Sequence, residues 1–371
     1  MASKISTLAQ IDTQFNADSV EWCPHNPAYF VCGTYQLIEG SCGDENAPKS
    51  SEKNTRVGSI ILLNFESSSR SVLEIQKIST AAVTDMKWGS RLINGTPLLA
   101  VTSSFGDVTL YLLNEKGGVL NLEKISSIDV SSPDLSLSLD WSYNPNSTMD
   151  SDGRIIVSDS GGSVSELTLS GSGNSFELLR KWKAHDFDAW ITAYDRWNSS
   201  TVYSGGDDCT LKGWDTRTGC YKPTFVSKSH TMGVCSIQSS PLVENIFASG
   251  SYDEQILVWD NRLMKCPLAR CDVGGGIWRL KWHPSKKDYL LAACCHAGFH
   301  VLMYDWNCGG LGVIGSYTGH ESLAYGADWG RGVFTGQCDV DENDGVLHEI
   351  LATCSFYDHT LHLWEMMYNK P

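Results

Sequence analysis

A unit that ends in Trp-Asp, or in the related pairs Tyr-Asp and Trp-Glu, recurs along the second half of this chain. Four copies can be aligned: SGGDDCTLKGWD from Ser204, SGSYDEQILVWD from Ser249, CCHAGFHVLMYD from Cys294 and CSFYDHTLHLWE from Cys354. Asp208, Asp253 and Gly298 hold the same place in consecutive copies, at intervals of 45 residues. Each copy has the pattern of a β-hairpin, and this period with a terminal Trp-Asp is typical of a β-propeller blade. Because one blade cannot bury both of its faces, the copies must stack around an axis.

Weaker copies in the first half bring the number of blades to seven. The sequence therefore predicts an all-β fold, a seven-bladed WD-repeat β-propeller that occupies residues 1–371 as a single domain. The expected blades lie near residues 18–78, 82–129, 135–182, 188–226, 232–271, 276–317 and 323–367. The last blade ends too soon for a fourth strand, so we expect residues 4–15 to supply it and close the ring.

Composition excludes several classes of function. The net charge is −15 and no cluster of Lys and Arg appears, which argues against nucleic acid. An acidic surface can attract a cationic partner or ligand, but from charge alone we favour the simpler interpretation that the acidity keeps the protein soluble. No apolar run is long enough to span a membrane, and the N-terminus lacks the apolar stretch of a secretory signal. The 13 cysteines form no CxxC pair, which indicates reduced thiols in a cytoplasmic protein. We expect no metal site, and a monomer, because a closed ring offers no free edge strand.

Three histidines precede the first strand of their blades, and we expect each to bond the Asp of its own blade's turn. The pairs are His185 with Asp208, His230 with Asp253, and His320 with Asp358. Ser204 and Ser249 complete two of these sets, whereas the last blade offers Cys354 at that position. Ser, His and Asp together resemble a hydrolase triad. We favour a structural role, because buried polar groups need partners and these groups satisfy one another.

His296 differs from these three. Its blade has Gly298 at the turn and the run Gly274–Gly276 where the structural His would stand. A His freed from that duty can face a pocket and act as a general base, while the alternative is a His bonded to nearby backbone. The adjacent Cys295 is a second candidate, as a nucleophile or as a buried strand thiol.

The loops between blades and the hairpin turns share one face of a propeller. The expected ligand-binding residues on that face are Asp207, Tyr252, Trp278, Glu321 and Tyr357. Aromatic rings and carboxylates around a central mouth can hold a quaternary ammonium group by cation–π attraction. A protein-binding surface needs the same residue types, and the sequence leaves both interpretations open.

Several segments are more specific than the repeat requires: GSYDEQILVWD, GGGIWRLKWHP, LLAACCHAGFHVL, SLAYGADW and ATCSFYDHTLHLWE. Together they resemble the diphthine methyl ester hydrolases, the WD-repeat proteins of diphthamide biosynthesis. The resemblance is dense from about Ser204 to Glu365 and looser before it. It implies hydrolysis of the methyl ester of methylated diphthine on translation elongation factor 2, which releases diphthine and methanol before the final amidation, without a cofactor.

Within that implied reaction, our hypothesis is that His296 activates a water molecule and that Tyr325, or the backbone of Gly274–Gly276, stabilises the oxyanion. A covalent route through Cys295 is the alternative mechanism. The competing class of function is a non-catalytic WD-repeat scaffold that docks enzymes of the diphthamide pathway or trafficking proteins.

Overall fold

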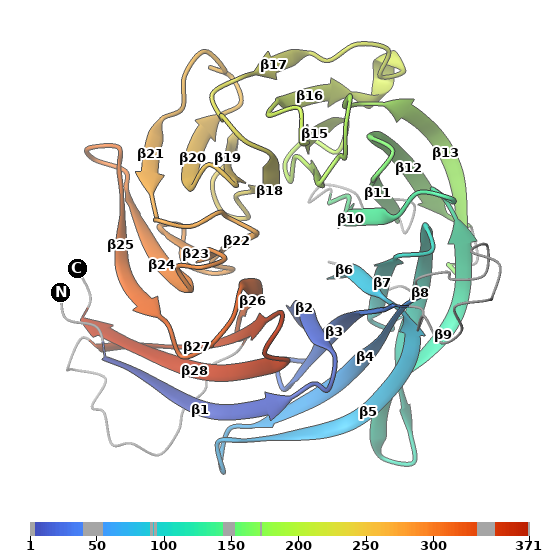
Figure 1. Ribbon diagram of the computed structural model, residues 1–371, viewed down its shortest axis with the longest axis vertical. Helices are drawn as coiled ribbons and strands as arrows, with labels where there is room; N and C mark the ends of the chain where they lie inside the picture. Colours follow the sequence, from blue (N-terminus) through green and yellow to red (C-terminus); the bar gives the residue numbers. More distant parts are fainter. Residues whose placement is uncertain are drawn as a thin grey trace, which may run out of the picture.

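Seven four-stranded antiparallel sheets stand around a central axis in the computed structural model (Figure 1). The structure describes residues 4–39, 55–89, 92, 95–143, 153–170, 173–331 and 346–369. The predicted all-β, seven-bladed WD-repeat propeller is therefore confirmed. Within these ranges, the single-turn η2 (Thr216–Thr218) interrupts the strands, and no helix has the length and hydropathy that a bilayer crossing requires.

The strands of each blade follow one another outward from the axis in chain order, apart from the last blade. Blade 1 contains β2 (Asn16–Trp22), β3 (Tyr29–Ile38), β4 (Thr55–Glu66) and β5 (Ser71–Ala81). Blade 2 contains β6 (Val83–Trp88), β7 (Leu98–Ser103), β8 (Asp107–Lys116) and β9 (Val119–Asp129). Blade 3 contains β10 (Ser136–Trp141), β11 (Arg154–Asp159), β12 (Ser163–Leu169) and β13 (Phe176–Lys183). Blade 4 contains β14 (Ile191–Tyr194), β15 (Thr201–Gly205), β16 (Leu211–Asp215) and β17 (Phe225–Ser227).

The remaining three blades complete the ring. Blade 5 contains β18 (Val234–Ser239), β19 (Ile246–Ser251), β20 (Gln255–Asp260) and β21 (Ala269–Asp272). Blade 6 contains β22 (Arg279–Trp282), β23 (Tyr289–Ala293), β24 (Phe299–Asp305) and β25 (Gly310–Tyr317). Blade 7 contains β26 (Ala324–Trp329), β27 (Val346–Ser355) and β28 (Thr360–Asn369), with β1 (Lys4–Asp12) at its outer edge.

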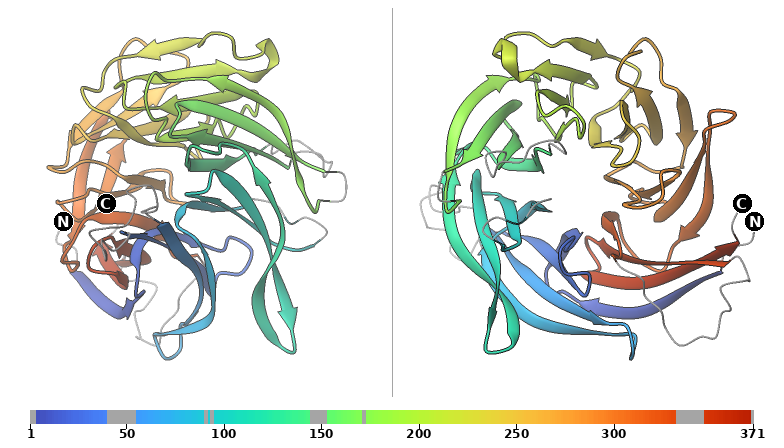
Figure 2. Two further views of the ribbon diagram at one scale, coloured as in Figure 1. Left: turned by 45° about the vertical axis from the view of Figure 1, so that its right-hand side comes forward. Right: turned by 180° about the vertical axis from the view of Figure 1, so that it is seen from behind.

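The two ends of the chain close the ring in blade 7. Strand β1 pairs with β28 from Lys4 opposite Met367 to Asp12 opposite Thr360, and the two strands lie side by side in the ring (Figures 1 and 2). The Ser6 hydroxyl donates a hydrogen bond to Glu365 at 2.8 Å. This closure by the N-terminal strand was predicted, and its physical effect is to cover the outer edge of β28.

Side chains of the innermost strands tie each blade to the next one. The Ser138 hydroxyl accepts a hydrogen bond from the backbone N–H of Thr192 at 2.9 Å, and the Asp328 carboxylate accepts one from the N–H of Trp22 at 2.7 Å. Tryptophan indoles also connect neighbouring blades: the Trp329 indole of blade 7 donates a hydrogen bond to the backbone carbonyl of Lys281 in blade 6 at 2.8 Å. These bonds connect the inner strands of neighbouring blades around the central channel of the propeller.

Candidate functional site

A pocket of about 450 Å³ lies at one end of this axial channel. Every blade contributes to its lining, and the geometry of the inner strands explains how. Five of these strands contain a register shift that leaves one residue out of the pairing: Asp18, Thr84, Leu137, Cys235 and Tyr325. All five line the pocket. A β-bulge re-aims the side chain of its extra residue, and here the bulges turn these side chains towards the axis.

Six aromatic side chains form an arc in the wall of the pocket: Trp190, Trp278, Tyr325, Phe356, Tyr357 and Tyr35. The Trp278 ring stacks on Tyr325 with centroids 4.5 Å apart and an interplanar angle of 21°. Trp190 contacts the other side of this pair, 5.5 Å from Trp278, and Phe356 lies 4.7 Å from Tyr325. We call these six residues the aromatic arc. Such a continuous surface of π faces suits a cationic ligand.

Two carboxyl groups share the pocket with the aromatic arc. Asp18 is 5% exposed, and burial, opposed by Arg279 and reinforced by Asp85, raises its pKa to about 8. Asp188 is more accessible, and its pKa is raised by partial burial and by the neighbouring carboxylates of Asp207 and Asp134. Negative charge therefore accumulates at the mouth of the pocket, while Asp18 holds a proton near neutral pH.

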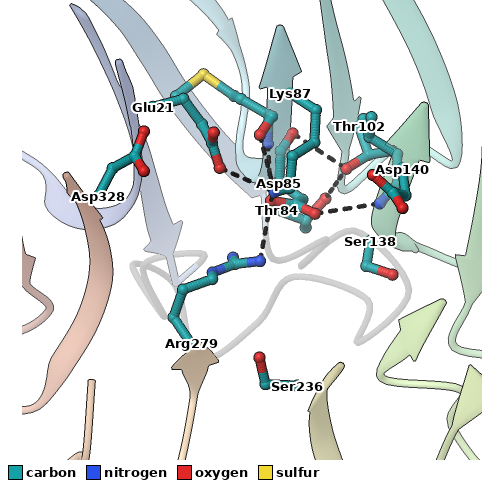
Figure 3. A network of polar contacts seen from close by, with 12 residues as sticks. Glu21, Thr84, Asp85, Lys87, Thr102, Ser138, Asp140, Ser236, Arg279 and Asp328 are labelled. Carbon is teal, nitrogen blue, oxygen red and sulfur yellow. Dashed lines mark hydrogen bonds and ion pairs between the residues drawn. The ribbon is translucent and has the colours of Figure 1, made fainter. Parts of the chain in front are cut away.

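Two arginines supply positive charge to the same pocket. Arg279 extends from the start of β22 towards β6, where one guanidinium nitrogen lies 3.1 Å from the Asp85 carboxylate (Figure 3). Arg56 forms a side-chain hydrogen bond with Tyr35 of the aromatic arc. The pocket thus combines a surface for a cation with two guanidinium groups, whose fixed donors suit a carboxylate.

A buried network of charges lies next to the pocket in the channel (Figure 3). Lys87 lies 2.7 Å from Asp85 and 2.9 Å from Glu21, and Lys281 lies 2.5 Å from the same Glu21. Burial opposes ionisation of Asp85, but Arg279 and Lys87 outweigh it and lower the pKa of that carboxyl. The network fixes Arg279 because its partner Asp85 is itself held by Lys87.

The proton on Asp18 predicts a specific pH dependence of stability. Between its ordinary pKa of 3.8 and the folded value of about 8, the unfolded chain has lost this proton and the folded chain keeps it. Each rise of one pH unit in that window therefore costs the folded state at most about 1.4 kcal/mol, and the dependence ends above the folded pKa. From about pH 6 to about pH 8, wild type should lose more free energy of unfolding than Asp18→Asn. Urea unfolding measures the difference, with the exposed Asp186→Asn as control, and parallel profiles for wild type and Asp18→Asn would contradict the assignment.

The structure brings some of the sequence-predicted site residues together and separates others. Tyr325, Trp278 and Tyr357 line the pocket. Asp207, Tyr252 and Glu321 do not line it but lie on the surrounding loops, where Asp207 accepts a hydrogen bond from the Trp190 indole at 2.6 Å. These three residues can contact only the part of a ligand that extends out of the pocket.

The expectation that His296 faces the pocket needs correction. His296 is exposed in the turn between β23 and β24 and is not among the pocket residues, because the turn directs it outward. Cys295 is buried behind it, with its backbone carbonyl bonded to the Ala324 N–H at 2.9 Å. Burial raises the pKa of the Cys295 thiol to about 12, which leaves little of the thiolate that a nucleophile requires.

The first two histidine sets have the expected partners. His185 contacts Asp208 at 2.8 Å and Ser204 at 2.7 Å, and the Trp214 indole donates to the same hydroxyl at 2.9 Å. In blade 5, His230 contacts Asp253 at 3.1 Å and Ser249 at 2.8 Å. Both serines are 0% exposed, so no substrate can reach their hydroxyls. These contacts stabilise the blades.

Blade 7 departs from that pattern. His320 reaches Thr353 at 3.0 Å, and the Trp364 indole donates to the same threonine hydroxyl at 3.0 Å. Thr353, not Cys354, therefore takes the serine position. Asp358 is bonded to the Ser355 hydroxyl, which in turn lies 2.8 Å from His320. The Asp is thus linked to the His through an intervening serine rather than directly.

Sequence reasoning missed Asp18, Arg279 and Arg56 as pocket residues. One signal was available for the first two. Asp18 lies in NADSVEW and Arg279 in IWRLKW, so both are charged residues within strands that should pack between other blades. A charge in an innermost strand is costly unless it is paired or functional, and it could have marked the channel.

Comparisons with known proteins agree with this architecture and narrow the family. Residues 221–260 match the WD domain, G-beta repeat family. The fold is similar to a chain in a crystal structure of the mitotic checkpoint complex, with a TM-score of 0.67, 16% identity, and coverage of 97% of this chain and 91% of that one. At this identity the likeness concerns the fold alone.

Three curated relatives span most of this chain. A diphthine methyltransferase of Mus musculus is 42% identical and covers 88% of this chain and 70% of its own length. The diphthine methyltransferase of Homo sapiens is 37% identical, and the match covers 96% of this chain and 98% of that protein. A diphthine methyltransferase homolog of Dictyostelium discoideum is 34% identical, and the match covers 94% of this chain and 96% of that protein.

The names of these relatives correct one expectation and confirm another. They denote enzymes that transfer a methyl group, so the methyl ester hydrolysis inferred from the sequence is contradicted. The link to diphthine is confirmed by identity over nearly the whole chain. This chain belongs to the diphthine methyltransferase family.

Proposed function

We propose that this chain takes part in methyl transfer at diphthine on a protein substrate, and that the pocket of the axial channel holds the diphthine side chain. The names of the relatives support the reaction class. Translation elongation factor 2 is the protein substrate that we propose, because diphthine is a modified histidine of that factor.

The observation that carries this proposal is the charge pattern of the pocket. Diphthine carries a trimethylammonium group, which is a permanent cation without N–H donors, and a carboxylate. Aromatic faces bind such a cation by cation–π attraction, and nearby carboxylates such as Asp188 add to it. Arg279 and Arg56 can bind the carboxylate of the same ligand. A volume of about 450 Å³ lies in the range of pockets that take one small ligand.

Asp18 and Tyr325 give the pocket groups that can hold protons beside the bound side chain. The raised pKa of Asp18 keeps its carboxyl protonated near neutral pH, so it can donate a hydrogen bond to a ligand oxygen. Burial also raises the pKa of the Tyr325 hydroxyl, which therefore stays protonated. Both groups can orient a carboxylate without adding negative charge next to it.

Mass spectrometry of the modified peptide tests the reaction. Purified elongation factor 2 that carries diphthine is incubated with this protein, with and without S-adenosylmethionine as methyl donor. We expect a mass increase of one CH₂ only when protein and donor are both present. The factor with an unmodified histidine is the control and should not change. An unchanged mass despite binding of the factor would overturn methyl addition.

A further inference from the structure

Four large aromatic side chains are exposed on the loops that surround the pocket mouth. The exposed fractions are 64% for Phe105, 65% for Phe187, 43% for Tyr252 and 66% for Tyr357. We call these four residues the aromatic rim. They lie on the turns after β7, β19 and β27 and on the loop before β14.

Hydrogen bonds tie three of these four segments to an adjoining loop. The N–H of Val130 donates to Gly106 beside Phe105, and the N–H of Tyr252 donates to Gly233 at 2.9 Å. The N–H of Tyr357 donates to the Ser322 hydroxyl at 3.1 Å. Because Tyr357 also lines the pocket, the aromatic rim and the pocket belong to the same face of the molecule.

The fold itself does not require large apolar side chains at these places. In blade 4, the turn position that corresponds to Phe105 and Tyr252 holds Asp207. Exposed rings leave apolar area in contact with water, and a group of them on one face marks a surface that a partner covers. Aromatic residues are also the side chains that contribute most to protein–protein binding.

The charge of the same loops indicates the chemistry of the partner. Their acidic residues are Asp134, Asp186, Asp188, Asp207, Glu254 and Glu321. Partial burial raises the pKa of Asp188, and the nearby carboxylates of Asp207 and Asp134 raise it further. Lys183 lies near these loops, and its ammonium group donates a hydrogen bond to the backbone carbonyl of Gly161 at 2.6 Å. A basic protein surface complements this arrangement.

We propose that the aromatic rim and its acidic loops form a docking surface for a basic face of the protein substrate, around the modified residue that enters the pocket. This inference rests on the proposed function for the identity of the partner. It assigns recognition to two separate elements: the rim binds the body of the substrate, and the pocket binds the modified side chain.

The two elements can be tested separately with elongation factor 2 that carries an unmodified histidine, because this factor lacks the ligand of the pocket. The test variant combines Phe105→Ser with Phe187→Ser, neither of which lines the pocket. The control combines Leu73→Ser with Leu178→Ser, which are 53% and 50% exposed on the strands β5 and β13. Thermal unfolding of both variants verifies that the fold is kept.

The rim variant should bind the unmodified factor about tenfold or more weakly than wild type, whereas the control variant should bind it like wild type. Asp186→Asn with Glu254→Gln should slow association and reduce its dependence on ionic strength. Unchanged affinity of the rim variant, or no binding of the unmodified factor to wild type, would overturn the docking surface. Equal affinity of wild type for modified and unmodified factor would instead contradict the pocket assignment and leave the docking surface intact.

Discussion

Trp278→Ala is expected to reduce kcat/KM for the diphthine-bearing factor by roughly thirtyfold or more, because it removes the centre of the aromatic arc. Trp278 stacks on Tyr325 at 4.5 Å and contacts Trp190 at 5.5 Å, so its loss leaves two separate groups of rings. A desolvated cation–π contact contributes about 2 kcal/mol or more, which sets the size of this effect. Titration calorimetry with the betaine of 2-aminobutyrate should show the same loss of affinity for the isolated ammonium and carboxylate groups.

Trp197→Ala is the matched control for this variant. Trp197 is 37% exposed and lies outside the pocket, and its indole donates to the Ser240 carbonyl at 3.0 Å. This substitution also removes an indole and its hydrogen bond, but it should leave kcat/KM and betaine affinity near wild type. Trp278→Phe, which keeps a π face, should recover much of the loss. Wild-type activity of Trp278→Ala would remove the aromatic arc from substrate binding.

The fold could be predicted from the sequence because its determinants are local and repeated. The spacing of Asp208, Asp253 and Gly298 defines one hairpin at a time, and the only stable use of such hairpins is a ring. Closure by β1 followed from the missing fourth strand of the last blade. The first of these inferences needed only neighbouring residues, and the second needed only a count of the strands in the last blade.

The site was predicted less completely because it depends on contacts across the axis. Trp278, Tyr325 and Tyr357 were found because they lie at the inter-blade loops and hairpin turns, which share one face of a propeller. The ion pair between Arg279 and Asp85 joins blades 6 and 2, and no local sequence pattern predicts this contact. His296 was misplaced because the loss of a structural partner does not determine where a turn directs its side chain. The raised pKa of Asp18 arises from burial that exists only in the assembled ring.

Lys281→Met is expected to cost about 3 to 5 kcal/mol of unfolding free energy at neutral pH, because it removes a buried cation from beside the buried carboxyl groups of Glu21 and Asp328. Lys281 lies 2.5 Å from Glu21 and 3.8 Å from Asp328, and all three side chains are at most 7% exposed. Burial by itself raises the pKa of Glu21, and Lys281 with Lys87 reverses that shift. Urea unfolding at neutral pH measures the loss. An exposed pair provides the control: Arg217→Met removes a 2.7 Å contact with Asp215 and should change stability little.

The pH dependence distinguishes lost charge compensation from lost packing. Burial already raises the pKa of Asp328 in wild type. Without Lys281, the folded-state pKa of Asp328 should rise further and that of Glu21 should rise as well, so the folded variant takes up more protons than folded wild type as the pH falls. The deficit of Lys281→Met relative to wild type should therefore be largest at and above neutral pH and become smaller towards acidic pH. Adding Glu21→Gln should recover part of the loss, since it removes one buried negative charge that has lost a partner. A deficit that is independent of pH and unaffected by Glu21→Gln would mean that Lys281 acts through packing alone, and that the charge network does not stabilise the channel beside the pocket.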